Sequence, residues 1–254
     1  MNQKTERTDI DLLRERARGL FISRATIDAT LEWATPRQVD AIDRMLATEL
    51  ANREASRRAR LMRQARFPVP KSLDGYDFMN VRLPDGYDRE RMTGLDFMDR
   101  AQDLVFYGRT GRGKTHLATA LGMKAVERGR SVRFRQTAEL VLQLGKAKRD
   151  GTLDNLLRDL ARADLIILDE FGYVPFDIDG ARLLYQVIAG SYERRSIIFT
   201  TNIEFSKWGT IFADDKLAAA IIDRIVHHGR LIEFTGPSRR VSQALMFGKT
   251  DTCQ

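Results

Sequence analysis

The eight residues GRTGRGKT, at positions 108–115, combine glycines, a lysine and a threonine in the order G-x-x-x-x-G-K-T. They follow the apolar run DLVFYG and precede HLATALG, so a strand is expected before the loop and a helix after it. A glycine-rich loop in that setting lets backbone N–H groups surround phosphates, and the N-terminus of the helix attracts negative charge. The stretch therefore predicts a phosphate-binding loop.

The side chains of this loop have separate expected roles. Lys114 reaches the β- and γ-phosphates of a nucleotide, and the Thr115 hydroxyl is a ligand for Mg²⁺. His116, the next residue, is counted with the nucleotide-binding residues. The three histidines of the chain lack the spacing of a metal site, and a structural or surface role is the alternative for each. The glycines of the site are Gly108, Gly111 and Gly113.

A second chemical signal is the run ADLIILDE, which ends in Asp169 and Glu170. Asp169 lies 55 residues after Lys114. Four apolar residues followed by acids indicate a buried strand with carboxylates at its tip, where α/β sheets bind ligands. Asp169 is expected to hold the water shell of a metal, and Glu170 to activate an attacking water. A core strand that merely ends in acids is the alternative.

Two later segments carry weaker signals. SIIFTTN predicts another buried strand, and its last residue, Asn202, either orients the water and senses the γ-phosphate or is a plain turn residue. KLAAAIIDRIVHHGR predicts a helix that carries Asp223 and Arg224. From the residues alone, Arg224 is either an ordinary surface residue or a cation that serves a nucleotide.

The alternation of elements predicts an α/β fold. Five β-branched or apolar runs, DLVFYG, SVRFRQ, ADLIILDE, SIIFTTN and RLIEF, are separated by helical stretches. Such a pattern favours a parallel five-stranded sheet flanked by helices. The expected domains are a helical region at 1–67, a linker at 68–100, the α/β core at 101–240 and a flexible tail at 241–254.

Composition narrows the setting. The chain has 254 residues, a formal net charge of +7 and an isoelectric point near 9.7, which points to a polyanionic partner without identifying one. A single cysteine, Cys253, excludes an intramolecular disulfide, and no apolar run approaches the ~20 residues that cross a membrane. We expect a cytoplasmic protein.

Two basic segments are candidates for DNA contact. ANREASRRARLMRQARF carries six arginines, and at ~100° per residue four of them share about a third of the helix circumference, namely Arg53, Arg57, Arg60 and Arg63. Such a face neutralises phosphates without reading bases. The second candidate is the cluster Lys146, Lys148 and Arg149. A solvated helix surface is the alternative for both.

The order of these motifs resembles that of an AAA+ ATPase. GKTHLATALG, LIILDEFGYVPFD, FTTNIEFSKWGTIFADD, AAAIIDRIVHH and GPSRR are similar to the IstB family of transposition helper ATPases, and KSLDGYDF resembles that family's linker into the core. The resemblance implies ATP and Mg²⁺ at Lys114 and Thr115, a Walker B pair at Asp169 and Glu170, and sensor 1 at Asn202. Only some twenty residues follow the last predicted strand, in keeping with a core that has no C-terminal helical lid.

Two further residues take their expected roles from the resemblance alone. Arg224 would be an arginine finger donated to the ATP of a neighbouring subunit, and Arg240 in GPSRR would be a substitute phosphate sensor. The loop departs from the family's usual GPPGVGKT at Arg109, Thr110 and Arg112, which leaves the role of both arginines open. Thr201 stands where the family often has serine, and the hydroxyl is kept.

The implied function is an ATP-dependent helper of insertion-sequence transposition. It would form a homo-oligomer with ATP at subunit interfaces, bind double-stranded DNA with little sequence preference, and recruit or stimulate a partner transposase. A replicative helicase loader of the DnaC type is the alternative, and IEFSKWGTIFADD and DEFGYVPFD favour transposition. No lid pattern follows the Walker B strand in this sequence, which argues against a small-molecule kinase, and no Asn-Lys-x-Asp motif is present, which argues against a GTPase. The presence of Lys114, Asp169 and Glu170 argues against a scaffold without turnover.

Overall fold

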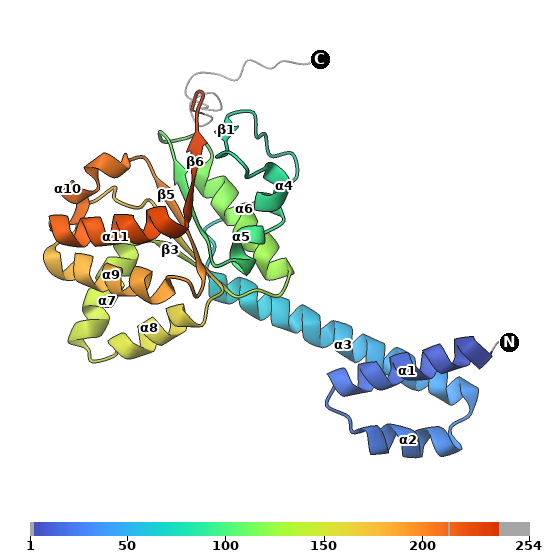
Figure 1. The fold of residues 1–254 in the computed structure, drawn as a ribbon. Coiled ribbons are helices and arrows are strands. Elements are labelled where there is room, and N and C mark those ends of the chain that lie inside the picture. Colours follow the sequence, from blue (N-terminus) through green and yellow to red (C-terminus); the bar gives the residue numbers. More distant parts are fainter. Residues whose placement is uncertain (1–2, 213, 239–254) are drawn as a thin grey trace, which may run out of the picture. The chain divides into compact units, whose positions relative to one another are not determined.

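The computed structural model describes residues 3–212 and 214–238, and contacts divide the chain into two units, Met1–Arg60 and Leu61–Gln254 (Figure 1). Each unit is described by itself. Arg240 and the region where a C-terminal lid would follow lie outside the described residues. The functional boundaries at 67, 100 and 240 stay predictions.

The N-terminal part of the described chain is helical, as predicted. Its elements are α1 (Gln3–Gly19), α2 (Arg24–Trp33) and α3 (Pro36–Ala65). α3 begins at Pro36, because the first helical position does not need an N–H donor. Leu13, Ala17, Ile27 and Leu46 form the small buried core of the first unit.

The second unit contains a sheet in the order β1-β6-β2-β5-β4-β3. The five strands β2 to β6 are parallel and coincide with the five predicted runs, which confirms the α/β prediction. β1 is an addition, since this two-residue strand pairs antiparallel with β6 at one border. The bounds are β1 (Val81–Arg82), β2 (Asp103–Tyr107), β3 (Val132–Gln136), β4 (Leu165–Asp169), β5 (Ser196–Thr201) and β6 (Gly229–Phe234).

Helices cover both faces of this sheet (Figure 1). α6 packs into one buried cluster through Leu117 and Leu121, while Leu140, Leu184 and Ile221 bring α7, α9 and α11 into the cluster on the other face. No helix in the described part of the chain has the length and apolar character needed to span a membrane. The bounds are α4 (Arg89–Thr93), α5 (Asp96–Asp99), α6 (Lys114–Glu127), α7 (Thr137–Arg149), α8 (Leu153–Ala161), α9 (Ile178–Ser191), η1 (Phe205–Lys207), α10 (Gly209–Phe212) and α11 (Asp215–His228).

The border strand β3 is protected by its own arginines. Arg133 and Arg135 are buried, and each donates from Nη1 to the carbonyl of the preceding residue, at 3.1 and 2.8 Å. Asp159 of α8 accepts from Nε and Nη2 of Arg133, at 3.0 and 2.7 Å. Charged side chains folded over a border strand discourage pairing with a further strand.

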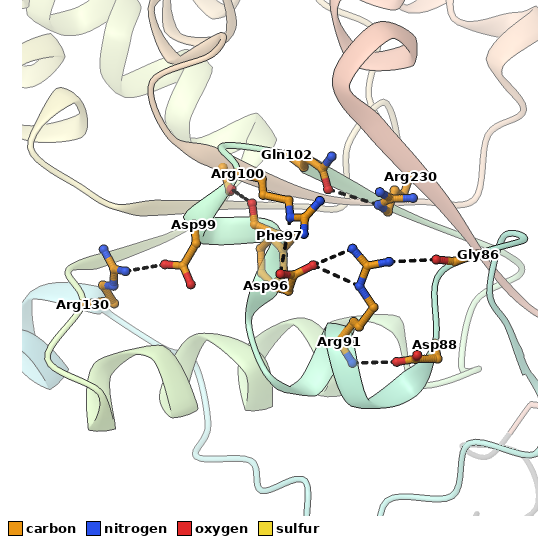
Figure 2. A network of polar contacts seen from close by, with 11 residues as sticks. Gly86, Asp88, Arg91, Asp96, Phe97, Asp99, Arg100, Gln102, Arg130 and Arg230 are labelled. Carbon is orange, nitrogen blue, oxygen red and sulfur yellow. Dashed lines mark hydrogen bonds and ion pairs between the residues drawn. The ribbon is translucent and has the colours of Figure 1, made fainter.

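Polar contacts fasten the two short helices α4 and α5 near the start of β2 (Figure 2). Nε and Nη2 of Arg91 donate to Oδ2 of Asp96, at 3.1 and 2.8 Å, and Arg100 lies 3.4 Å from the other oxygen of this carboxylate. Asp99 accepts from Arg130 at 2.5 Å. These acids are thus already engaged by arginines.

Candidate nucleotide site

The phosphate loop joins β2 to α6, and its glycines have conformations that other residues rarely adopt. Gly108 has a φ of 151°, and a Cβ there would lie 2.3 Å from the carbonyl oxygen of Phe234. Gly113, with a φ of 94°, precedes α6 and gives it no side-chain cap. The N–H groups of the first turn of α6 therefore remain suited to an anion.

Two basic residues of the loop bond to backbone carbonyls. Lys114 is buried, and its Nζ donates to the carbonyl oxygens of Gly108 at 2.5 Å and Arg109 at 3.0 Å. Nη1 of Arg112 donates to the carbonyl of Phe234 at 2.9 Å. Arg112, whose role the sequence left open, thus ties the loop to the end of β6, while Arg109 is exposed.

A hydroxyl and carboxylate network connects the ends of three neighbouring elements. Oδ1 of buried Asp169 accepts from the hydroxyl of Thr115 at 2.9 Å and from that of Thr200 at 2.5 Å. The Thr200 oxygen also accepts from the backbone N–H of Glu170 at 3.0 Å. The phosphate loop, β4 and β5 are therefore fixed to one another at the carboxyl edge of the sheet.

Glu170 turns away from this network. Its φ of 55° lies in the left-handed region, which a residue other than glycine adopts only when its surroundings impose it. Its side chain is exposed and lines the same cavity as the phosphate loop. A buried acid fixed by hydroxyls and an exposed acid facing the cavity suit two different roles, binding and proton transfer.

The cavity beside the loop has a volume of about 500 Å³. Residues that the sequence did not single out complete it, because the segment after α3 folds onto the start of α6. The Tyr76 hydroxyl donates to the Gly113 carbonyl at 3.3 Å, and Nε2 of His116 lies 3.1 Å from the Ser72 carbonyl. The lining residues are Pro68, Val69, Lys71, Thr110, Gly111, Gly113, Lys114, Thr115, His116, Thr119, Glu170 and Tyr173.

Asn202 and Arg224 do not line this cavity. Asn202 is exposed at the end of β5 and lines a second hollow of about 380 Å³, with which the first shares Tyr173. Arg224 donates to the Ala220 carbonyl of its own helix at 3.0 Å, and its guanidinium carbon lies 5.1 Å from the centre of the Tyr185 ring. The chain's own fold therefore does not bring Arg224 to its own phosphate loop.

The candidate DNA-binding residues are exposed on two helices. On α3, Arg53 lies 2.7 Å from Glu49 and Arg57 lies 3.8 Å from Glu54, so acids of the same helix offset part of their charge. Arg60 and Arg63 are also exposed. The last turn of α7 carries the second cluster, in which Lys148 lies 3.7 Å from Asp179, and Lys146 and Arg149 are exposed.

Comparison with known proteins identifies the relatives of this fold and site. Residues 24–246 match the family described as IstB-like ATP binding protein. The chain belongs to this IstB-like family. A protein from Geobacillus stearothermophilus, named as an ATP-binding protein of insertion sequence IS5376, is 34% identical, and the match covers 85% of this chain and 87% of that one. The corresponding protein of IS21 from Pseudomonas aeruginosa is 40% identical over 72% of this chain and 69% of its own length.

Solved structures of replication proteins share the fold of this IstB-like chain. DnaI has a TM-score of 0.53 at 21% identity, and the DnaC helicase loader a TM-score of 0.52 at 20% identity. These matches cover 66% and 65% of this chain and 96% of each of the other two. DnaA bound to AMPPCP and single-stranded DNA has a TM-score of 0.53 at 18% identity, over 68% of this chain and 52% of that chain. The core is thus an AAA+ fold.

Proposed function

We propose that this chain is an ATPase that binds ATP with Mg²⁺ in the 500 Å³ cavity and couples its hydrolysis to assembly on DNA during transposition of an insertion sequence. The observation that carries the nucleotide part is the network in which Asp169 accepts from Thr115 and Thr200 beside the glycine loop. Membership of the IstB-like family and the names of its insertion-sequence relatives support the transposition part.

The donors present fit a hydrated magnesium ion. Thr115 and Asp169 offer a hydroxyl and a carboxylate, the oxygen ligands that Mg²⁺ prefers. Within the described residues no group of three or more His, Cys, Asp or Glu is placed to hold a metal, so phosphate oxygens and water would supply the other ligands. When bound, the metal neutralises charge on the phosphates.

The remaining groups divide the hydrolysis among themselves. When ATP binds, Lys114 exchanges its bonds to loop carbonyls for bonds to phosphate oxygens. Its buried ammonium therefore has hydrogen-bond acceptors both without and with the nucleotide. Glu170 takes a proton from the water whose oxygen attacks the γ-phosphorus, while the bond from that phosphorus to the bridging oxygen breaks. Asn202, next to the cavity through Tyr173, orients the water.

The test of this function is Glu170→Gln in the full chain. It keeps the size of the side chain and the backbone bond to Thr200 but cannot accept the proton. We expect nearly unchanged ATP binding, turnover reduced by roughly 10² to 10⁴, and a trapped complex with DNA. Glu127→Gln, at the exposed end of α6, is the matched control. Wild-type turnover in Glu170→Gln would rule out the proposed base.

Arg224 supports a second part of the proposal, a site that is complete only between subunits. Its guanidinium is held by the Tyr185 ring and the Ala220 carbonyl, and no carboxylate of the described residues lies within 4 Å of it. A full positive charge therefore remains for the nucleotide of a neighbouring copy, where a trans arginine stabilises the transition state. Hydrolysis would then require assembly.

The arginines of α3 are the proposed DNA contacts of the N-terminal region. Their pairs with Glu49 and Glu54 are exposed, contribute little to stability, and can be exchanged for phosphates. Replacing Arg53, Arg57, Arg60 and Arg63 together by alanine should weaken binding to random duplex DNA and flatten its salt dependence. An unchanged salt slope would remove α3 from the contact surface.

A helicase loader remains the second candidate, since DnaC and DnaI share the core fold. The insertion-sequence relatives are more similar in sequence, at 34% and 40% identity against 20% and 21%. Purified chain incubated with ATP should retain an insertion-sequence transposase and not a replicative helicase. Retention of the helicase alone would reverse the order of the two candidates.

A further inference from the structure

Three neighbouring strands of the core are each preceded by arginine at the amino edge of the sheet. Arg130 precedes β3, Arg162 precedes β4, and Arg194 and Arg195 precede β5. The strands are adjacent in the order β5-β4-β3. Backbone bonds from Asp164 to the Ser131 carbonyl and from Ser196 to the Asp164 carbonyl, at 2.9 and 3.4 Å, join the three connections. We call these four arginines the arginine edge.

The acids nearest to this edge contact Arg130, Ser131 or His228, and none of them contacts the other three arginines. Oδ2 of Asp164 accepts from both the backbone N–H and the hydroxyl of Ser131 at 2.7 Å, and its other oxygen is 3.9 Å from Arg130. Asp99 binds Arg130, as Figure 2 shows. Glu193 lies 3.0 Å from Nε2 of His228. Among the described residues, no carboxylate oxygen lies within 4 Å of Arg162, Arg194 or Arg195.

A small excess of positive charge results. Segments 128–131, 161–164 and 193–195 hold five arginines and two carboxylates, and Asp99, which binds Arg130, is a third carboxylate, so the excess is two charges. The C-termini of α6, α8 and α9 lie here, and each offsets about half a charge, so the positive charge of this edge rests mainly on the exposed Arg162 and Arg194. Burial lowers the pKa of the Arg195 guanidinium, the neighbouring Arg194 lowers it further, and Asp164 raises it.

We propose that the arginine edge binds the phosphate backbone of duplex DNA, an assignment that rests on the DNA binding proposed above. Strands ~4.8 Å apart spread the arginines over about 10 Å, the length occupied by roughly three phosphates of one DNA strand. Guanidinium groups bind phosphate oxygens in pairs.

The surface is poorly suited to a protein partner. None of the exposed large apolar side chains of the described chain belongs to the three segments that carry the arginine edge. Protein interfaces are centred on buried aromatic or aliphatic anchors, which this surface does not offer. A surface made of arginines without such anchors favours a polyanion.

The arginine edge can be altered without touching the nucleotide site. Strands of five residues, at ~3.3 Å per residue, separate the two edges by about 17 Å. Arg162 and Arg194 are exposed, and neither side chain takes part in the hydroxyl and carboxylate network. Replacing them should leave ATP binding intact.

The experiment compares R162E/R194E with R82E/R182E, which makes the same charge change at exposed positions away from the edge. Binding of the full chain to a labelled random duplex is followed by fluorescence anisotropy over a salt series, with a non-hydrolysable ATP analogue present. R162E/R194E should lose at least tenfold in affinity, and the slope of log K against log salt should fall by about two. R82E/R182E should lose less than half as much, and R162K/R194K should restore most of the binding.

The outcomes distinguish the proposed DNA function from the role of the arginine edge. If the wild-type chain shows no salt-dependent binding to the duplex, both the DNA function and the arginine edge are overturned. Wild-type binding with equal loss in R162E/R194E and the control overturns the arginine edge alone. If R162E/R194E still bound DNA but no longer captured the transposase, the proposal would be overturned, and the arginine edge would instead bind an acidic protein segment. Thermal unfolding and ATP binding, measured on every variant, identify a folding defect.

Discussion

The two edges of the same sheet differ in how their polar side chains are satisfied. At the carboxyl edge, Thr115, Asp169 and Thr200 share short hydrogen bonds, and Asp169 and Thr200 are buried. At the amino edge, Arg162 and Arg194 are exposed and have no carboxylate within 4 Å among the described residues. The first edge holds its polar groups in place before a ligand arrives, and the second holds unneutralised charge.

This difference implies different responses to solution conditions. Buried hydrogen-bonded groups are screened little by salt, whereas exposed charges lose most of their attraction beyond a Debye length of ~10 Å at 0.1 M salt. ATP binding should therefore change little across a salt series in which DNA binding falls steeply. Four substitutions test how far this contrast holds, from the largest expected effect to the smallest.

Arg224→Ala asks whether the carboxyl edge is complete within one chain. Since Arg224 does not line the cavity of its own chain, ATP binding by the isolated chain should be unchanged. DNA-stimulated turnover should fall by about 10³ to 10⁵, the usual contribution of a trans arginine. Mixing with Lys114→Ala chains should restore part of the activity, because some mixed sites have both groups. No recovery at any mixing ratio would contradict the trans role.

Lys114→Ala asks how much of the carboxyl edge depends on one buried cation. Its ammonium should contribute charge-assisted bonds to phosphate, so the dissociation constant for ATP should rise at least about 10²-fold, at ~1.4 kcal/mol per tenfold. Titration with a fluorescent ATP analogue measures it. Lys124→Ala, at the far end of the same helix, should bind as the wild type does. Equal binding by the two variants would argue against the phosphate role.

Thr200→Val tests the hydroxyl that links both acids. It removes a bond to Asp169 and leaves the backbone N–H of Glu170 without its acceptor, which costs about 1–2 kcal/mol for each bond that is lost. Turnover should fall roughly tenfold while ATP is still bound. Thr200→Ser, which keeps the hydroxyl, should remain near the wild type. If Thr200→Ser lost as much activity as Thr200→Val, retention of the hydroxyl would not be enough for turnover, and the role given to its hydrogen bonds would be contradicted.

Asp103→Asn tests the amino edge for pH dependence. Burial raises the pKa of Asp103 to about 7, although its oxygen accepts from the Ile197 N–H at 2.7 Å. Stability from the neutral carboxyl is complete below pH 3.8 and is lost as pH rises to about 7. Asparagine keeps the acceptor without the charge. The variant should therefore melt several degrees higher at pH 8, with a smaller difference at pH 5, in thermal scans.

The sequence predicted the carboxyl edge better than the amino edge for a physical reason. Phosphate binding requires glycines, lysine and threonine at fixed spacing, so Lys114 and Asp169 stood out before the fold was known. Thr200 did not, because its value comes from the pairing of β5 beside β4, a contact between distant segments. The five parallel strands followed from their apolar runs, whereas the two-residue β1 is too short to give a pattern.

No sequence motif indicated the arginine edge. Arg130, Arg162 and Arg194 lie in three separate connections, and only the strand order places them together. Conversely, the arginines of α3 were visible in the sequence because they share one helix. Whether Arg224 serves a neighbouring subunit stays a prediction, because that role depends on a second copy of the chain.

The end of β6 has a mechanical consequence. α11 passes into β6 without an intervening residue, and the carbonyl of Phe234 at the other end of β6 holds Arg112 and closely approaches Gly108. β6 is bonded to β2 and β1 along its sides. The helix that carries Arg224 is therefore joined to the phosphate loop of the same chain by one continuous strand that is hydrogen-bonded on both sides.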